Sequence, residues 1–578
     1  MKERILRVNL NTGKLSQEAV PLKYERLGGR ALTSRILLDE VDPASQPLSP
    51  KNKMILAPGL LGGTTAPCCG RLSIGSKSPL TGGIKEANVG GTAGHLMAQL
   101  GIKALIMEGR YSKGKYCVLK VTPGGAQIVP ADELGGLGNY KTVEKILDSF
   151  RGEGQDKITV ISIGQAGEML MAGASIAVTD RHHRPSRHAA RGGLGAVLGS
   201  KGVKAIVLDG STMKEKIPYY HGDEFRQISR KFTQELTETK QVLTKYGTSI
   251  TLDVSQKIGC LPTRNFSQGQ FEGYTQINPQ KLYEIITERG GKTTDACMIG
   301  CPIRCGNIYN DEKGNYLTST LQYESIVMLG PNCGIGNWDI IATLNFLCDD
   351  YGLDTIEMGA AMGVVMEAGL LQFGDGKGAV ELLKEVEKGT VLGKLIAQGA
   401  ELTGRVLGVK RIPAVKGQSL AAYDPRSLKG TGVTYATSPM GADHTAGNAL
   451  PGRVGIDQNR HWNLDTLDRE DKVELSRDLQ IIFTAGDCVG FCLLAGFSVE
   501  SMKVMAQLIQ ARHGYSISLE DVLNLGRDTL RWEIEFNRGS GLTLAHDQLP
   551  DFLLEEKLPP HNTVFDIPSS ELKEVFNF

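Results

Sequence analysis

Three evenly spaced cysteines are the residues of this chain best suited to metal chemistry. Cys297, Cys301 and Cys305 lie in DACMIGCPIRCGN, each separated from the next by three residues. On a continuous helix they would span about 12 Å, at about 1.5 Å per residue, which is too far for three ligands of one cluster. Because Gly300 and Pro302 interrupt a helix, we predict a loop that turns the three sulfur atoms toward one another.

Three clustered thiolates with one distant partner are typical of a 4Fe-4S cluster, whereas structural zinc sites usually combine two Cys-x-x-Cys pairs. Cys492, at the end of DCVGFC, is the predicted fourth ligand. A simpler alternative stays open for all four, because cysteine is often a small core side chain without any ligand. Of the other cysteines, one set borders glycine-rich segments and could approach a site, and a second set is expected in the core: Cys68, Cys69, Cys333 and Cys488, then Cys117, Cys260 and Cys348.

Glycine-rich segments point to close contact with an anionic ligand. The chain contains 71 glycines in 578 residues, well above the usual share of about 7%. Backbone N–H groups in such turns bind phosphate, and Arg71, Lys77 and Arg191 could add charged hydrogen bonds. No P-loop pattern occurs, and RGGLGAVLG does not match the dinucleotide-binding pattern Gly-x-Gly-x-x-Gly. Each segment alone could equally be an ordinary tight turn.

The elements that carry these residues divide the chain into a strand-rich part and a helical part. RILRVNLNTGKL and KYCVLKVTPGGAQIV each indicate two strands joined by a turn, and KITVISIG and KAIVLDG indicate further strands. From residue 219 onward, apolar residues recur at helical spacing between charges. We expect an α+β fold, with a β-rich N-terminal domain over residues 1–207 followed by two mainly helical domains over 208–410 and 411–578.

Composition excludes several classes of partner. The 64 basic and 64 acidic residues cancel, so no overall field attracts nucleic acid or an anionic membrane. No segment has the roughly 18 apolar residues of a membrane helix, and no secretory signal precedes the first strand. An odd count of 11 cysteines argues against a disulfide framework. We therefore expect a cytoplasmic protein with reduced thiols or metal-bound cysteines.

One short pattern occurs in each predicted helical domain. Residues 349–354 and 487–492 both read Asp-x-x-Gly, then an apolar residue, then Asp or Cys. With these motifs in view, the whole chain resembles the tungsten-containing aldehyde:ferredoxin oxidoreductases. Nine segments occur in the order of that family: GGRALTSRIL, SPLTGGIKEANVGG, RGGLGAVLGSKGVKAI, PTRNF, the cysteine triplet, QYESIVMLGPNCGIGN, DYGLDTIEMG, SPMGADHTAGN and DCVGFC.

The resemblance implies a cofactor at the domain interface: tungsten or molybdenum held by two pterins, with magnesium bridging the pterin phosphates and the 4Fe-4S cluster nearby. The residues it implies for cofactor binding are Arg71, Asn88, Gly90, Ala189, Asp349, Gly352, Leu353, Asp487, Gly490 and Phe491. The implied cluster ligands are Cys297, Cys301, Cys305 and Cys492. Two departures stand out: the family spaces its cysteine triplet by two and then three residues, and it usually has leucine where Phe491 stands.

The resemblance also implies the reaction, which is oxidation of aldehydes to carboxylic acids. Electrons would pass through the cluster to ferredoxin or a partner iron-sulfur subunit, and an oligomer or hetero-complex is expected. Glu324 in QYES and His444 in GADHT match the family's catalytic residues beside the metal. Glu324 suits removal of a proton from attacking water, and His444 suits donation of a hydrogen bond to the carbonyl oxygen. Without the family, each would be read as a helix-surface or turn residue.

Three alternatives remain at this stage. A related branch of the family reduces aromatic acyl-thioesters and ligates its metal through a protein cysteine, for which Cys333 in GPNCGIGN is the candidate. A second alternative is a non-catalytic electron-carrying subunit, in which the cluster functions and the glycine-rich loops are only structural. A third is a protein stabilised by zinc.

Overall fold

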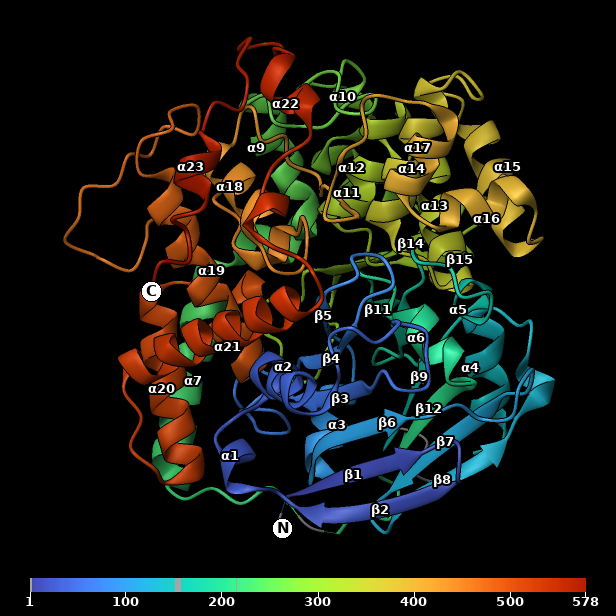
Figure 1. Cartoon of the computed structure of the whole chain (residues 1–578), viewed down its shortest axis with the longest axis vertical. Coiled ribbons are helices and arrows are strands. Elements are labelled where there is room, and N and C mark those ends of the chain that lie inside the picture. The colour runs from blue at the N-terminus through green and yellow to red at the C-terminus, as the bar shows by residue number, and fades with distance from the viewer. Residues whose placement is uncertain (1–2, 151–156, 215) are drawn as a thin grey trace.

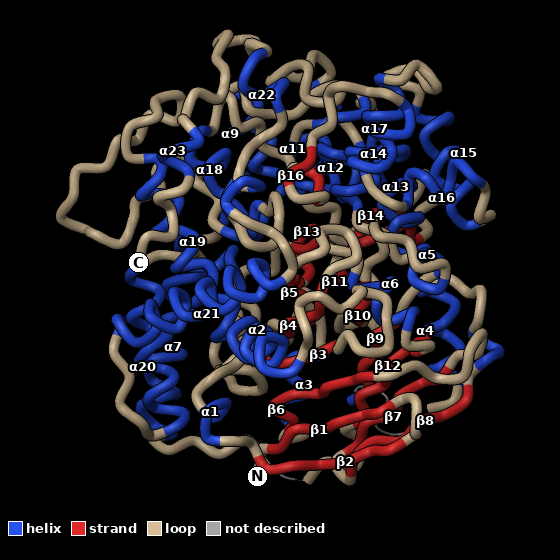
Figure 2. The backbone as a smooth tube through the Cα atoms, in the orientation of Figure 1, coloured by secondary structure: helices blue, strands red, loops and turns tan. Residues whose placement is uncertain are grey.

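The computed structural model describes residues 3–150, 157–214 and 216–578, and it has the α+β architecture expected from the sequence. Strands gather in the lower half of the molecule as seen in Figure 1, whereas helices form most of the upper half and the left side (Figure 2). Most of these strands come from the first 209 residues. The β-rich N-terminal domain is therefore confirmed as a feature of the fold.

The first of two large sheets has six strands in the order β2-β1-β6-β3-β4-β5. β1 and β2 form the predicted hairpin, with Asn9 opposite Lys14. Gly13 closes its turn at φ +70°, a conformation that glycine adopts without steric cost. β1 pairs in parallel with β6, and the other pairs are antiparallel. The strands are β1 (Arg4–Asn9), β2 (Lys14–Ala19), β3 (Met54–Pro58), β4 (Leu72–Lys77), β5 (Ile84–Val89) and β6 (Ile102–Glu108).

The second sheet also has six strands, in the order β11-β10-β9-β12-β7-β8. β7 and β8 form the hairpin predicted from KYCVLKVTPGGAQIV, and β7 pairs in parallel with β12. The remaining pairs are antiparallel. The strands are β7 (Cys117–Thr122), β8 (Gly125–Pro130), β9 (Ile158–Ser162), β10 (Ile176–Val178), β11 (Arg187–Ala189) and β12 (Val203–Asp209).

The two sheets share one topology. Each sheet begins with a hairpin, β2-β1 or β8-β7. The hairpin pairs in parallel with the last strand of its sheet in sequence order, β6 or β12, and three antiparallel strands, β3-β4-β5 or β9-β10-β11, complete the sheet. β1 to β6 thus correspond in order to β7 to β12. The last strands of the two sheets, β5 and β11, contact each other. This duplication was not visible in the sequence, and it brings equivalent strands together at a seam.

Short helices connect the strands, and one longer helix joins the first sheet to the rest of the molecule. α2 (Gly29–Glu40) packs against β3, β4 and β5 on one side and against α19 (Lys472–Val489) and α21 (Leu519–Gly539) on the other. Arg30 is buried there and donates hydrogen bonds to both carboxylate oxygens of Glu533 at 2.9 and 2.8 Å. The other N-terminal helices are α1 (Leu22–Glu25), α3 (Ala93–Gln99), α4 (Asn139–Asp148), α5 (Gln165–Glu168) and α6 (Leu194–Ser200).

The middle of the chain is mainly helical, as predicted, but it also contains a small sheet. β13 (Lys292–Asp295), β14 (Gly306–Asn310) and β15 (Tyr316–Ser319) pair in that order, and the cysteine triplet connects β13 to β14. The helices are α7 (Gly222–Thr239), α8 (Gln241–Tyr246), α9 (Thr251–Lys257), α10 (Tyr274–Ile277), α11 (Pro279–Glu288), α12 (Tyr323–Leu329), α13 (Trp338–Tyr351), α14 (Thr355–Glu367), α15 (Gly376–Glu387), α16 (Val391–Ala397) and α17 (Ala400–Leu407).

Helix α7 illustrates why this part folds as the sequence pattern indicated. Phe225, Ser229, Phe232 and Leu236 are its buried residues, and a spacing of three and four places them on one face. Burying each large apolar side chain contributes about 1.5 to 3 kcal/mol. This face packs against α20 (Val499–His513), far along the chain.

The helical cores cross the boundary predicted near residue 410. Residues of α12 to α14 share one hydrophobic core with α18 and with the C-terminal segment 549–575, whereas α7 shares another with α19 to α21. A division at residue 410 therefore stays a prediction. The elements after it are β16 (Ala414–Val415), β17 (Gln418–Ser419), α18 (Lys429–Thr437), α19 (Lys472–Val489), α20, α21 (Leu519–Gly539), α22 (Asp551–Glu555) and α23 (Ser569–Leu572).

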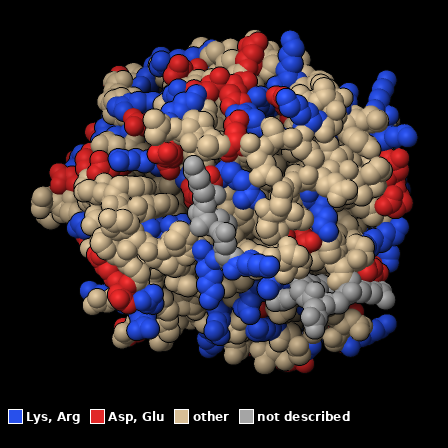
Figure 3. Space-filling view, turned by 90° about the horizontal axis from the view of Figure 1, so that it is seen from below, with Lys and Arg blue, Asp and Glu red and all other residues tan. Residues whose placement is uncertain are grey.

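Within the described ranges, none of the helices has the length and apolar character needed to cross a membrane. Seen from below, a group of Lys and Arg side chains lies near the middle of this face, and both basic and acidic side chains occur toward its edges (Figure 3).

Candidate active site

The cysteine triplet lies in a loop, as predicted. Residues 296–305 have no helix or strand, and Gly300 has φ +75° at the turn. His95, on α3, anchors this loop: its Nε2 lies 3.2 Å from the carbonyl oxygen of Ile299, while its Nδ1 accepts a hydrogen bond from the backbone of Gly63 at 3.1 Å. The loop is thereby held against the first sheet and its connections.

The fourth predicted cysteine lies beside the triplet: the backbone N–H of Cys492 donates to the carbonyl oxygen of Cys68 at 2.9 Å, and the Cys68 thiol lies 3.8 Å from that of Cys301. Burial, with the nearby thiols Cys297, Cys492 and Cys301, raises the pKa of Cys305 well above its ordinary value. A single zinc ion would need four sulfurs at about 2.3 Å from it. Among the residues that the structure describes, no group of three or more His, Cys, Asp or Glu side chains is arranged tightly enough for one ion. A cubane cluster binds each thiolate to a different iron atom, so it accepts this wider arrangement.

A fifth thiol lies against the same group. The Sγ atoms of Cys68 and Cys301 are 3.8 Å apart, and this contact lowers the pKa of the Cys301 thiol to about 6. It raises the pKa of Cys68 well above the ordinary value, so the Cys68 thiol is placed to donate a hydrogen bond to a Cys301 thiolate. Arg71 adds positive charge, since its Nη2 lies 3.3 Å from the Sγ atom of Cys492.

The two Asp-x-x-Gly motifs have the same local structure, which explains why the pattern recurs. Each forms the end of a long helix, α13 or α19, and its glycine is the C-terminal cap at φ +72° for Gly352 and +82° for Gly490. Glycine is favoured there because this left-handed conformation costs other residues free energy. The aspartate therefore lies in the last helical turn, next to the first carbonyl groups without a helical partner.

Each helix end also meets a glycine of the N-terminal domain. A Cβ atom on Gly352 would lie 2.8 Å from the backbone nitrogen of Gly164, and one on Gly490 would lie 2.9 Å from the Cα atom of Gly59. Gly59 directly follows β3, and Gly164 lies two residues after β9, its counterpart in the second sheet. The duplicated sheets therefore each receive one motif.

A large cavity opens between these helix ends and the seam of the two sheets. Its volume is about 280 Å³. Of the predicted site residues, the following line it: Arg71, Asn88, Gly90, Cys297, Glu324, Asp349, Leu353 and His444. Burial raises the pKa of Asp349 well above its ordinary value, and its Oδ2 accepts a hydrogen bond from Nδ2 of Asn345 at 3.2 Å.

The two predicted catalytic residues meet in this cavity. Nε2 of His444 lies 3.3 Å from Oε1 of Glu324, and the hydroxyl of Tyr423 donates to the same oxygen at 3.3 Å. Glu324 occupies the first turn of α12, where the helix N-terminus favours negative charge. The side chains of Glu324 and His444 are 15% and 17% exposed, so water reaches both.

A buried ion pair positions His444. Nζ of Lys85, on β5, lies 2.9 Å from Oδ2 of Asp443, and Oδ1 of Asp443 accepts a hydrogen bond from the backbone of Thr445 at 2.9 Å. Burial raises the pKa of Asp443, but the charges of Lys85, Arg191 and His444 outweigh it and hold this pKa far below the ordinary value. The loop that carries His444 is thus tied to β5, the strand that carries Asn88.

Unpartnered donors in the walls show that the cavity fits an anionic cofactor. Nε of Arg71, Nδ2 of Asn88, and Nε and Nη2 of Arg187 are buried without any hydrogen-bond partner among the described residues. Buried donors of this kind require acceptors, and phosphate oxygens match guanidinium groups well. Asn88 and Ala189 lie on β5 and β11, so the equivalent strands bring them to the seam.

Other predicted residues lie behind the walls. Ala189, Gly352, Asp487, Gly490 and Phe491 are buried or capping residues that are not among the described residues lining the cavity, although the neighbours of Ala189 and Gly352 are. Arg30 pairs with Asp487 at 3.3 Å, and burial raises the pKa of Asp487 well above its ordinary value. Their part in binding stays a prediction.

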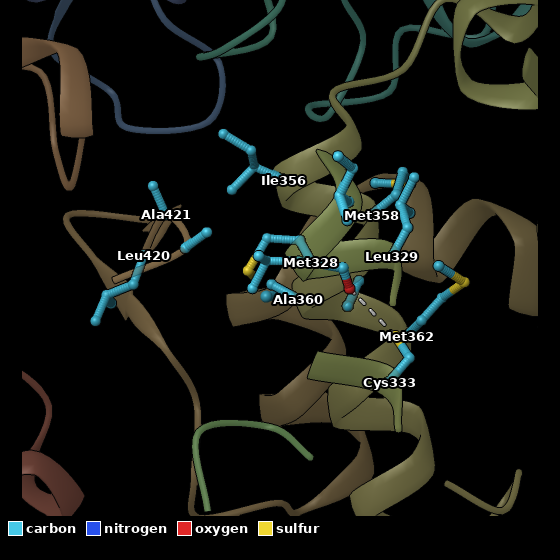
Figure 4. Packing of buried hydrophobic residues seen from close by; sticks show 14 of the residues in the cluster. Met328, Leu329, Cys333, Ile356, Met358, Ala360, Met362, Leu420 and Ala421 are labelled. Carbon is cyan, nitrogen blue, oxygen red and sulfur yellow. Dashed lines mark hydrogen bonds between the residues drawn. The ribbon is translucent and has the colours of Figure 1, made fainter. Parts of the chain in front are cut away.

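Three side chains considered from the sequence are used elsewhere. Lys77 donates to the carbonyl oxygen of Pro43, and Arg191 lines the cavity but is occupied by Asp354 at 3.2 Å and by the carbonyl oxygen of Ala442 at 2.7 Å. Cys333 lies in a hydrophobic core, where its thiol is 3.4 Å from the carbonyl oxygen of Met328 (Figure 4). It is not among the described residues that line the cavity.

Sequence reasoning missed three residues of the site. Arg187 stands four positions before Arg191 in the segment that was considered, but nothing local distinguishes the free guanidinium from the paired one. Cys68 was considered without being assigned, and Tyr423 lies in AAYDP, which carries no recognisable signal. Only the packing of distant segments places these side chains at the site.

Comparisons with known proteins agree with this arrangement. The family model described as "Aldehyde ferredoxin oxidoreductase, N-terminal domain" matches residues 5–210, and the one for domains 2 and 3 of the same enzyme matches residues 226–576. The tungsten-containing aldehyde ferredoxin oxidoreductase of Thermococcus kodakarensis is 34% identical over 581 residues, which cover 96% of this chain and 92% of that protein. The corresponding Pyrococcus furiosus protein is 32% identical over 587 residues, with the same coverage of 96% and 92%.

A solved structure has the same fold. The active-site complex BamBC of benzoyl coenzyme A reductase, in complex with 1,5-dienoyl-CoA, superposes with a TM-score of 0.82 over 99% of this chain and 93% of that chain. Sequence identity is 18%, so this likeness concerns the fold alone.

Proposed function

The chain belongs to the aldehyde ferredoxin oxidoreductase family, and on this premise we propose that it oxidises aldehydes to carboxylic acids at a tungsten bis-pterin centre. The observation that carries the proposal is the cavity itself, where Glu324 and His444 are 3.3 Å apart and Cys297 also forms part of the wall. When bound, the metal centre supplies the acceptor for the two electrons that leave the aldehyde.

The protein residues handle the protons. Oε1 of Glu324 accepts a proton from the water that attacks the carbonyl carbon, which makes that water a better nucleophile. Nε2 of His444 donates a hydrogen bond to the carbonyl oxygen, where negative charge develops. Nε2 of His444 lies 3.3 Å from Glu324. For His444 to donate to the substrate, the carbonyl oxygen must therefore bind beside Glu324, within hydrogen-bond distance of this same nitrogen. Tyr423 holds Glu324 by its hydroxyl.

The cofactor-binding residues follow from the same geometry. Arg71, Arg187 and Asn88 would bind the pterin phosphates, and the seam between β5 and β11 would hold bridging magnesium near Ala189. The two helix-end motifs would bind one pterin each, through Asp349 and Asp487. With the predicted division into regions 1–207, 208–410 and 411–578, the first motif belongs to the first helical region and the second motif to the second.

Electrons would leave through a 4Fe-4S cluster bound by Cys297, Cys301, Cys305 and Cys492. Ile299, in the loop between the first two ligands, is 58% exposed, so a partner protein can approach the cluster closely there. Ferredoxin or an iron-sulfur subunit suits this one-electron step.

Anaerobic purification followed by metal analysis and a dye-coupled assay tests the proposal. We expect tungsten and about four irons per chain, and reduction of a viologen dye when simple aldehydes are added. A colourless protein without iron or a group-six metal would refute it. Iron without tungsten or molybdenum would instead indicate an electron carrier, and absence of dye reduction with every aldehyde would favour an acyl-thioester reductase.

A further inference from the structure

One wall of the cavity carries an arginine that no carboxylate neutralises. Arg453 lies in the loop before α19 and lines the cavity beside Leu450, Phe483 and Leu494. Its Nη1 donates a hydrogen bond to the carbonyl oxygen of Phe497 at 2.7 Å, and its guanidinium lies 5.8 Å from the centre of the Phe483 ring. Within the part of the chain that the structure describes, no acidic side chain comes within the 4.0 Å of an ion pair with it.

A second cation lies close to Arg453. Lys240 follows α7, and a Cβ atom on Gly496 would lie 3.4 Å from its Nζ, next to the residue whose carbonyl Arg453 contacts. Burial lowers the pKa of Arg453, while burial and the charge of Arg453 lower that of Lys240. Glu235 is the acidic residue whose field reaches Lys240, but the two form no ion pair. Holding two partly buried cations together costs free energy, which an anion between them would offset.

Arg453 lines the same cavity as the predicted catalytic residues Glu324 and His444. Tyr423, whose hydroxyl donates to Glu324 at 3.3 Å, is also part of its wall. Leu450, Phe483 and Leu494 are apolar walls of the same cavity, and the Arg453 guanidinium lies over the Phe483 ring. The cavity therefore contains proton-accepting and hydrogen-bonding groups, apolar side chains and the positive charge of Arg453.

We propose that Arg453 selects aldehydes that carry a carboxylate at the end remote from the carbonyl group. This proposal rests on the proposed aldehyde oxidation. A guanidinium presents two parallel N–H groups that match the planar carboxylate. A phosphate dianion is usually bound by several donors, whereas Arg453 lies against the apolar ring of Phe483 in the cavity wall.

A purely structural role for Arg453 predicts different kinetics. If Arg453 only held the Phe497 carbonyl and packed on Phe483, its loss would affect every aldehyde equally. If Arg453 instead binds a carboxylate, its loss affects aldehydes that carry a carboxylate and spares neutral aldehydes of similar size. The interaction acts on substrate binding, so KM changes while kcat does not.

Matched substrate pairs test the proposal on the anaerobically purified holoenzyme. The pairs are benzaldehyde with 4-carboxybenzaldehyde and butanal with succinic semialdehyde; 4-formylbenzenesulfonate and glyceraldehyde 3-phosphate test other anions. We expect kcat/KM to be higher for the carboxylated member of each pair. Arg453→Met should raise KM for that member roughly 10- to 100-fold, as expected for a lost charged hydrogen bond, and change kcat/KM for the neutral member less than about twofold. The KM of Arg453→Lys for the carboxylated member should lie between those of wild type and Arg453→Met.

Controls separate the possible failures. Arg460→Met serves as the matched variant, because Arg460 lies in the same loop but pairs with Asp471; it should behave as wild type. Binding of terephthalate, measured by calorimetry, should weaken in Arg453→Met and gives a readout independent of turnover. Equal kcat/KM within each pair, or a preference for sulfonate or phosphate, would overturn this proposal alone. Failure of wild type to oxidise every aldehyde would overturn the proposed function and, with it, this inference.

Discussion

Replacing Glu324 by glutamine tests the assigned chemistry most directly. The amide keeps the size of the side chain and one oxygen, so the hydrogen bond from Tyr423 at 3.3 Å can persist. The change removes the negative charge and the ability to accept a proton from water. Since the contacts of Glu324 are 3.3 Å or longer and its side chain is 15% exposed, we expect the free energy of unfolding to change by no more than about 1 kcal/mol.

The kinetic effect should be much larger. A positioned general base typically contributes about 10²- to 10⁴-fold, which corresponds to roughly 3 to 5 kcal/mol in the activation free energy. We therefore expect kcat for aldehyde oxidation to fall at least 100-fold, measured anaerobically by viologen reduction. KM should change little, because the carboxylate acts on water rather than on the bound substrate.

Two control measurements accompany this prediction. Tungsten and iron contents of Glu324→Gln should equal those of wild type, so that the loss cannot come from an empty site. Glu312→Gln, at an exposed position of the surface, should retain full activity. If Glu324→Gln turned over at the wild-type rate with both metals bound, Glu324 would have no role in proton transfer and the reasoning would fail.

Three further predictions concern the surrounding structure. Glu533→Gln should reduce the free energy of unfolding by about 1 to 3 kcal/mol, because buried Arg30 loses the charge of its partner 2.8 Å away and retains Asp487 at 3.3 Å; an unchanged midpoint in anaerobic urea titration would contradict this. Cys68→Ala should lower the reduction potential of the cluster by about 20 to 60 mV, the equivalent of one lost hydrogen bond to Cys301; redox titration followed by EPR would show no shift if Cys68 made no such bond. Burial lowers the pKa of His513 from 6.5 to about 4, so between these values the unfolded chain binds a proton that the folded chain does not. Stability should therefore fall with decreasing pH, by about 2 kcal/mol from pH 7 to pH 5 for this residue, and His513→Gln should remove that part of the pH dependence in denaturant titrations.

The sequence predicted those features that depend on neighbouring residues. The hairpins of β1 with β2 and of β7 with β8 follow from alternating side chains around a turn, and α7 follows from its apolar spacing. The cysteine loop was predictable because Gly300 and Pro302 break a helix. The resemblance to a family supplied Glu324 and His444, which no local pattern would have distinguished from residues of an ordinary helix or turn.

Other features required the packing of segments hundreds of residues apart. The duplication of the two sheets lies in strand order, which leaves no periodic signal in the sequence. Cys333 and Cys68 both border glycine-rich segments, yet Cys333 is buried in a core and Cys68 contacts Cys301, a predicted cluster ligand. Arg187 and Arg453 carry the same guanidinium as the ion-paired Arg191, and only their surroundings differ.

The sequence by itself thus determined which residues form hairpins, helices and a ligand-bearing loop, because hydrogen bonding and side-chain periodicity act over a few residues. Tertiary structure alone decided which thiols meet and which buried charges lack a partner. Those outcomes depend on distances between segments that are remote in the chain, and local preferences carry no information about such distances.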